Sequence, residues 1–556
     1  MNKTKALYNA FCSNLEMPKP GGGKKVKIYN RFGMIAFFGI MVPVSVILGL
    51  VTYALTDLLF LFEDYSYGLL SELDIISAFA MIFGMMLMFS VLFFSSDLRF
   101  LTALPISPTS LYVARFWHTF KAENVMTSNV LLAIYIGYFV AVAKNAGVLF
   151  ALHPIGLIAA IVGFYSSLLV PLIYCSIIGL LLMLALRRFN RADIYYHSSL
   201  VLFVIFAGLF LLSFGSYGNV RTEGYLDTLV TGSNTFTSVC NVLFPTNFLT
   251  TLAIKNHDIL PLLGAIAFVA ALYALSVLTA RLTYREGLFA AATMSTSTRS
   301  RQVASSVGQR TVFSSLLSKE IKVLTRTMTY RMNCIYANLL WPLLAVFFMV
   351  QMSGNEFLKS FAESVRAGDS MSRVIVFAVI VGAAFIASGL NSIASTSFTR
   401  EGTHIDMLKY LPAPLASQIK AKVLTAVLFT FVPEVIAVIL VTVGLGDLLM
   451  LPLYVLVSFV CILIATVIGV VMDSISPYTI WSDELSALRG NLNCFFNLAA
   501  EMLAALLVGV LAYGLFMLTA SAVITIAAIT VVLAAGGVIC VKVGLPRAER
   551  NIVELK

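Results

Sequence analysis

Long stretches without charge dominate this sequence and leave few folds open to it. Runs of roughly 18 to 30 residues without Asp, Glu, Lys or Arg alternate with short segments that hold nearly all of the charge. Only 12% of the 556 residues are charged, whereas charged residues approach about a quarter of a soluble protein. At about 1.5 Å of rise per residue, each run is long enough to cross about 30 Å of hydrocarbon. We therefore expect an all-α integral membrane protein.

Uninterrupted apolar length predicts about twelve transmembrane helices. They cover residues 34–55, 75–94, 125–142, 155–184, 198–215, 259–279, 335–352, 374–395, 423–443, 451–472, 498–518 and 522–541. The fourth is longer than a bilayer requires, so we expect it to tilt, to kink near Pro171 or to project into the cytosol.

The basic residues predict the orientation of these helices. If the N-terminus is cytosolic, the inner segments hold 31 of the 37 Lys and Arg residues and the outer loops hold 6. The positive-inside rule then places both termini in the cytoplasm. The first outer loop agrees, because its charged residues are all acidic: Asp57, Glu63, Asp64, Glu72 and Asp74. The net charge of +10 flanks membrane helices, where it sets topology and meets anionic headgroups, so it requires no nucleic-acid partner.

Residues with catalytic or metal-binding patterns are missing from the sequence. The 7 cysteines include no CxxC pair, and the 5 histidines are scattered without ligand spacing. The run Gly21-Gly22-Gly23-Lys24-Lys25 superficially resembles a phosphate-binding loop, but it lacks the spacing and the Ser or Thr of G-x-x-x-x-G-K-[ST]. We expect no catalytic residue, no metal site and no cofactor in this chain.

A repeat divides the chain into two halves. The polar segment 281–312 separates six expected spans in residues 1–280 from six in residues 313–556. At one offset of 307 residues, five positions match: Leu101 with Leu408, Leu104 with Leu411, Pro105 with Pro412, Ala114 with Ala421, and Arg115 with Lys422. Six is an even number, so we expect two parallel six-helix repeats related by an axis along the membrane normal. A chance match between two loops that end in Leu-Pro is the alternative.

Short helices are also predicted at the cytosolic side of each half. Ser107 as N-cap and Pro108 at the first helical position predict a helix start in the first half, and Pro414 can take the same part in the second. Residues 4–16 and 314–331 have the pattern of amphipathic helices that lie on the inner leaflet.

In these features the chain resembles the permease subunits of type-2 ATP-binding cassette exporters, with two six-span halves fused. In that family an elbow helix precedes each half, and a coupling helix between spans two and three docks on the ATPase. The usual signature matches Arg400-Glu401-Gly402 and Leu411-Pro412, whereas the first half departs from it with Ser95-Ser96-Asp97. The resemblance implies two ATPase-coupling loops, formed by Asp97, Arg99, Phe100, Leu101, Leu104 and Pro105, and by Arg400, Glu401, Gly402, His404, Asp406, Met407, Leu408, Leu411 and Pro412.

The loop after the tenth span is similar to that of one bacterial branch of these exporters. Its matching residues are Asp473, Pro477, Trp481, Glu484, Arg489, Asn491 and Asn493. The resemblance implies a permease in the bacterial plasma membrane that moves an amphiphilic or hydrophobic substrate. It also implies two copies of a separate ATPase subunit as partners, which would bind ATP and Mg, together with membrane lipids. Trp481 by itself is equally compatible with an interfacial anchor.

Two acidic residues, Glu434 and Glu501, lie in spans that otherwise hold no charge. A carboxylate at a helix centre costs about 2.5 to 3.5 kcal/mol on insertion scales, so each should face protein or water, or be protonated. Each is compatible with a hydrogen-bonded structural role or with substrate or cation handling. Asn391, near the inner end of the eighth span, is expected to hold helices together.

Other classes of function stay open on the sequence alone. A secondary transporter driven by an ion gradient would use Glu434, which follows Pro433 in the ninth span. A membrane-embedded enzyme is less favoured, because no cluster of His, Asp, Glu or Cys converges at one membrane face. The outer segment 216–258 corresponds to the place where the family has an external gate.

Overall fold

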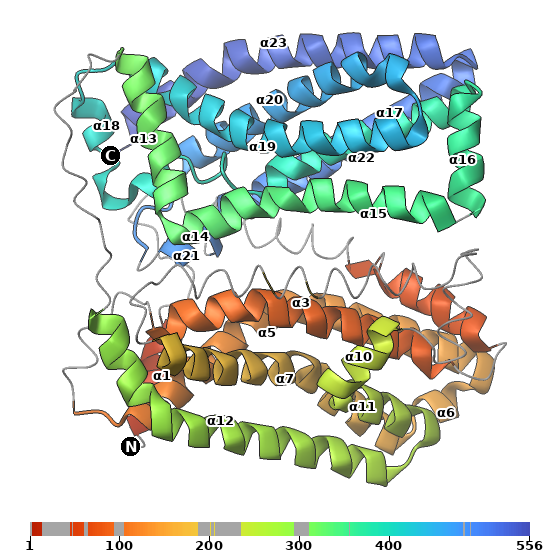
Figure 1. The fold of residues 1–556 in the computed structure, drawn as a ribbon, viewed down its shortest axis with the longest axis vertical. Helices are drawn as coiled ribbons and strands as arrows, with labels where there is room; N and C mark the ends of the chain where they lie inside the picture. The colour runs from red at the N-terminus through yellow and green to blue at the C-terminus, as the bar shows by residue number, and fades with distance from the viewer. Residues whose placement is uncertain are drawn as a thin grey trace. The chain divides into compact units, whose positions relative to one another are not determined.

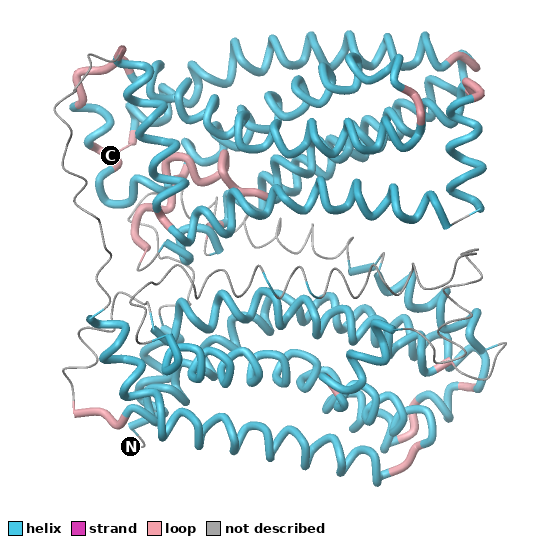
Figure 2. The backbone as a smooth tube through the Cα atoms, in the orientation of Figure 1, coloured by secondary structure: helices cyan, strands magenta, loops and turns pink. Residues whose placement is uncertain are grey.

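The structure is a computed structural model that describes residues 3–13, 45–46, 48–60, 65–93, 105–186, 201, 205, 235–293, 311–354, 356–481, 484–489 and 491–555. Every regular element of these residues is helical (Figure 2). Contacts between Cα atoms group the described residues into two compact units, one ending at Thr293 and one beginning at Thr311.

Eight helices of the described residues are long and apolar enough to cross a membrane. The first unit contributes three, which are α5 (Pro108–Ala146), α7 (Pro154–Leu186) and α12 (Ile259–Thr293). The second contributes five, which are α17 (Ser370–Leu390), α19 (Leu415–Leu445), α20 (Leu451–Ile475), α22 (Leu492–Thr519) and α23 (Ala522–Glu554) (Figure 1). The expected all-α multi-pass membrane protein is confirmed, and each of these helices coincides with a predicted span.

The other four predicted spans do not correspond to any of these eight helices. The run 75–94 falls in α3 (Ser66–Phe93), which is 28 residues long but is not among those eight helices. The run 34–55 overlaps a shorter apolar helix, Leu48–Leu59. The run 335–352 yields only the 15 residues of α15 (Leu340–Gly354). The run 198–215 lies outside the described residues except for residues 201 and 205.

In the first unit, α7 continues through Pro171 without ending. It packs against α3, α12 and α11 (Pro245–Asn256). The helix between Leu48 and Leu59 approaches α5 so closely that a Cβ on Gly49 would lie 2.8 Å from the carbonyl oxygen of Ala133. Such contacts between backbones are how helices associate in lipid, where burial of apolar surface supplies little drive. The remaining short helices of this unit are α1 (Lys3–Ser13), α6 (Val148–Ala151) and α10 (Thr235–Leu243).

The segment between the fifth and sixth predicted spans contains α10 and α11, which are bent by 98° relative to each other. The α11 helix buries a polar face, including Thr246 and Thr250. Its Asn247 Nδ2 donates to Asp74 Oδ1 at 3.0 Å and to Ser77 Oγ at 3.0 Å, both on α3. The prediction that Asp74 belongs to an outer loop is therefore wrong, because its carboxylate is buried in α3, where it accepts this bond.

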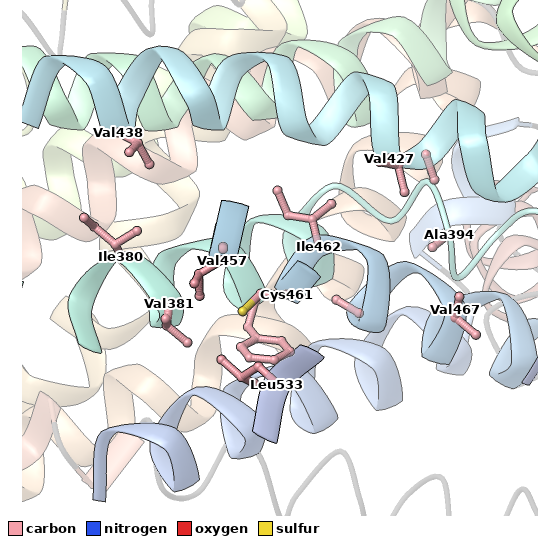
Figure 3. Packing of buried hydrophobic residues seen from close by; sticks show 14 of the residues in the cluster. Ile380, Val381, Ala394, Val427, Val438, Val457, Cys461, Ile462, Val467 and Leu533 are labelled. Atoms are coloured by element: carbon pink, nitrogen blue, oxygen red, sulfur yellow. The ribbon is translucent and has the colours of Figure 1, made fainter. Parts of the chain in front are cut away.

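The second unit begins with α13 (Val312–Arg326), the predicted amphipathic helix at 314–331, capped by Thr311. Aliphatic side chains of α17, α19, α20 and α23 form its core, among them Ile380, Val427, Ile462 and Leu533 (Figure 3). The helix α23 continues to Glu554, beyond the predicted span at 522–541. The remaining helices are α14 (Met328–Tyr330), a π-turn (Arg331–Ile335), η3 (Tyr336–Leu339), α16 (Glu356–Arg366), η4 (Thr399–His404), α18 (Met407–Tyr410), η5 (Leu448–Met450) and α21 (Glu484–Arg489).

Candidate functional site

The second predicted coupling loop, residues 400–412, lies in a compact turn that follows α17. The helix ends at Leu390 because the Asn391 side chain accepts a hydrogen bond from the Ile393 backbone N–H at 2.9 Å. The chain then forms η4 and α18, which lie at the same end of the second unit as α13 (Figure 1). Gly402 has φ +58° and ψ −139°, a backbone conformation that residues other than glycine rarely adopt.

Asp473, at the end of α20, fixes the start of this turn. Its Oδ2 accepts the backbone N–H groups of Phe398 at 2.6 Å and Thr399 at 3.0 Å. Its Oδ1 accepts the Thr399 hydroxyl at 2.6 Å and Asn493 Nδ2 at 2.9 Å. The carboxylate is fully buried and accepts four hydrogen bonds, so it acts as a fixed anchor for the turn.

Two other residues of the family-like loop bond to the same threonine. Asn491 Nδ2 donates to Thr399 Oγ1 at 3.1 Å, and Trp481 Nε1 donates to the Thr399 carbonyl oxygen at 3.0 Å. The indole also covers Gly402, where an added Cβ would lie 3.0 Å from Trp481 Cζ2. We call Asp473, Trp481, Asn491 and Asn493 the loop clamp. Two motifs that are about 75 residues apart in sequence thus form one structure.

Of the remaining residues in the family-like loop, Pro477 precedes Tyr478, whose backbone N–H donates to Thr399 Oγ1 at 3.1 Å. Glu484 is exposed at the start of α21. Arg489 ends α21, a helix that lies against η4 and α14.

A cluster of charged side chains holds the other side of the turn. Lys422 of α19 is buried, and its Nζ lies 2.9 Å from Glu320 Oε1 and 2.6 Å from Glu401 Oε1. Lys319 Nζ lies 2.6 Å from the same Glu401 oxygen. Burial raises the pKa of Glu401, but the Lys422 and Lys319 ammoniums outweigh it and lower that pKa to about 2. Arg400 donates to the carbonyl oxygen of Ile393 at 2.7 Å, so this cation also closes the turn.

The far side of the turn exposes apolar side chains. Met407 is 60% exposed, Tyr410 84% and Leu411 43%. His404, Asp406 and Pro412 are exposed beside them. Leu408, in contrast, is 4% exposed and packs in the core of the unit, so it is not part of the exposed surface of this loop. We call Met407, Tyr410, Leu411 and Pro412 the exposed tip.

The first predicted coupling loop lies mostly outside the described residues, which exclude Asp97, Arg99, Phe100, Leu101 and Leu104. Pro105 is described and exposed. The predicted cap is confirmed, because Ser107 Oγ accepts the Ser110 backbone N–H at 3.2 Å and Pro108 begins α5. In the second half Pro414 is itself the N-cap residue, one position earlier than Pro108 in its helix.

Two positions that the predicted repeat matches, Arg115 and Lys422, have similar surroundings within their own units. Arg115 is buried in α5 and donates to the carbonyl oxygen of Val91, near the end of α3. Lys422 is buried in α19 and donates to the carbonyl oxygen of Ser397, after the end of α17, at 2.8 Å. Each of the two residues also contacts the short helix that begins its half: Arg115 lies 5.6 Å from the ring centroid of Phe11 in α1, and Lys422 contacts α13.

The intramembrane polar residues occupy different surroundings. Asn391 Nδ2 donates to Thr430 Oγ1 at 2.7 Å and to Asn338 Oδ1 at 3.2 Å, so it joins three elements as expected. Glu434 is buried, and its Oε2 has no hydrogen-bond partner among the described residues. Glu501 is fully buried, and neither of its carboxylate oxygens has such a partner within the described part of the chain.

Sequence reasoning missed two central residues of the site. Thr399 precedes the Arg-Glu-Gly signature and carries no charge, so only the geometry reveals that the loop clamp closes on it. Glu320 belongs to the predicted amphipathic helix at 314–331 and was given no role, yet it is buried against Lys422. The sequence did contain an indication of this burial, because Glu320 is a lone acid on the apolar face of a basic amphipathic helix.

Eight helices of the described residues that are long and apolar enough to cross a membrane define a multi-pass all-α membrane protein. A scan against protein-family models found no match, and searches of curated proteins and of solved structures found none either.

Proposed function

We propose that this chain is the membrane-spanning permease subunit of an ATP-driven exporter, and that residues 400–412 dock on a separate ATPase. The observation that carries the proposal is the exposed tip on a buried polar base. An exposed apolar cluster at one end of a helix bundle marks an interaction surface. The base is bonded to α19, α20 and α22, so a push on the tip would reach several helices together.

The proposal includes twelve spans in two parallel six-helix repeats with both termini in the cytoplasm of a bacterium. The equivalent contacts of Arg115 and Lys422 with the segments that lead into the two loops support the repeat. Two loops require two copies of the ATPase subunit, which would hold ATP and Mg. Closure of those subunits would move one half against the other and expose a site for an amphiphilic or hydrophobic substrate to each side in turn.

The test is recovery of the partner from native membranes. Wild-type chain should co-purify with a protein that carries a phosphate-binding Lys loop, at about two copies to one. Tyr410→Asp and Leu411→Asp should reduce that recovery strongly, because each puts a charge at the centre of an apolar contact. Leu449→Asp, at an exposed site of η5, is the matched control and should recover the wild-type amount. Equal recovery with all three variants would refute the docking assignment.

A secondary transporter is the alternative that a specific observation favours. Glu434 presents a buried carboxylate oxygen without a hydrogen-bond partner in the described residues, which suits transient binding of a proton or a cation. On this alternative Glu434→Gln abolishes transport and no ATPase is recovered. Recovery of an ATPase together with normal transport by Glu434→Gln would exclude it.

A further inference from the structure

A cavity of about 330 Å³ lies in the second unit, away from the loop clamp. It is lined by the first turns of α17 and α20, by Met450 of η5 and by residues 522–531 of α23. The helix α17 runs from this cavity, at Ser370, toward η4. Its walls are apolar side chains such as Leu453, Ile526 and Val531. Among the residues that line it, Arg373 is the one with a charge.

Arg373 has more donors than acceptors around it. Its Nη2 lies 3.5 Å from Asp447 Oδ1, and Asp447 also accepts the Tyr454 hydroxyl at 3.3 Å. Both contacts are long, and Arg373 Nε is buried without a hydrogen-bond partner among the described residues. A guanidinium has five N–H donors in a planar fork. The side chain as a whole is 25% exposed, and Arg373 lines the cavity.

The chemistry of the site combines an apolar wall with one under-bonded cation. Unmet donors are costly at the low dielectric of a membrane. A phosphate group can accept two N–H bonds from one guanidinium, and the adjoining wall can cover a hydrocarbon chain. A small inorganic anion would leave that wall unused. We propose that this cavity binds an anionic phospholipid, with its phosphate on Arg373 and an acyl chain along α20 and α23.

This lipid site is independent of the proposed export function, since it uses none of the residues of the exposed tip or the loop clamp. The probes are phosphatidylglycerol and phosphatidylcholine, added to the purified full chain and followed by native mass spectrometry and thermal unfolding. We expect phosphatidylglycerol to be retained and to raise the midpoint more than phosphatidylcholine does. In Arg373→Gln the preference for phosphatidylglycerol over phosphatidylcholine should fall by about tenfold or more, because the charge-assisted hydrogen bonds to the phosphate are lost.

Two further variants make the result specific. Lys359→Gln removes an exposed positive charge from α16, outside the cavity, and should keep the preference. Ala527→Phe fills the apolar wall while leaving the Arg373 and Asp447 pair in place, and should reduce binding of both lipids. An equal preference for phosphatidylglycerol in wild type and Arg373→Gln would overturn the proposal, and so would undiminished binding of both lipids by Ala527→Phe. Inorganic phosphate that stabilises the chain as much as phosphatidylglycerol would also overturn it, because the chain-binding wall would then have no role.

Discussion

Asp473→Asn is the sharpest test of how the proposed coupling loop, residues 400–412, is held in place. The wild-type carboxylate accepts four hydrogen bonds, two on each oxygen. An amide keeps one oxygen, so two donors lose their acceptor and face an N–H group instead. Hydrogen bonds to a charged group contribute about 1.5 to 3 kcal/mol each, which gives a loss of about 3 to 6 kcal/mol. For a unit of this size the thermal midpoint should fall by about 10 °C.

Intrinsic fluorescence can follow this unfolding, because Trp481 belongs to the loop clamp. Tryptic cleavage after the exposed Lys409 gives a second, local readout of the loop. Asp406→Asn is the matched control, since Asp406 is exposed and pairs with Lys409 at 3.1 Å, an interaction of at most about 1 kcal/mol. If both variants melt together and are cleaved at the same rate, the four bonds do not hold the loop and the reasoning fails.

Three further predictions follow from the same turn and from the buried acids. The pKa of Glu401 is lowered from 4.5 to about 2 in the folded chain, so its ionised form should contribute about 3 kcal/mol to the free energy of unfolding above pH 4.5. That contribution should be lost as the pH falls toward 2. Glu401→Gln should therefore have a lower melting temperature at pH 7, and its melting temperature should change less with pH between pH 5 and 3. Gly402→Ala should lower the midpoint more than Gly147→Ala, because both positions have positive φ but only the first brings a Cβ to 3.0 Å from Trp481. Glu501→Gln should change the midpoint little, because neither carboxylate oxygen has a hydrogen bond to lose within the described residues, and a large loss in the same melting assay would show that the charge matters.

The sequence predicted what depends on local pattern. Apolar length placed eight helices correctly, because a bilayer requires every backbone group to bond within its own segment. Ser107 and Pro108 predicted a helix start, because a cap is a contact between near neighbours in the chain. The meeting of Asp473 with Thr399 could not be predicted in this way, since it depends on how α17 and α20 pack.

Burial was the other property that the sequence left undetermined. Leu408 and Leu411 are alike in type and lie one helical turn apart, yet one is buried and the other is exposed. Which face of so short a helix turns inward depends on tertiary contacts such as the bond from Gln418 Nε2 to the Leu408 carbonyl oxygen at 3.0 Å. The burial of Asp74 was missed for the same reason: it depends on a tertiary contact with Asn247, which lies 173 residues away in the sequence.

The contrast between the base and the tip of the turn explains why a surface loop should contain so many buried polar groups. Replacing a buried ionic cluster by apolar residues is often neutral or stabilising, so the cluster of Glu320, Glu401 and Lys422 is weak evidence of a need for stability. Directional bonds do, however, fix one geometry, and packed interiors transmit displacement because they compress little. The proposed coupling, in which motion of a partner reaches α19, α20 and α22 through this turn, would need both properties. Changes at the base should therefore alter stability and coupling together, whereas changes at Tyr410 should alter partner binding alone.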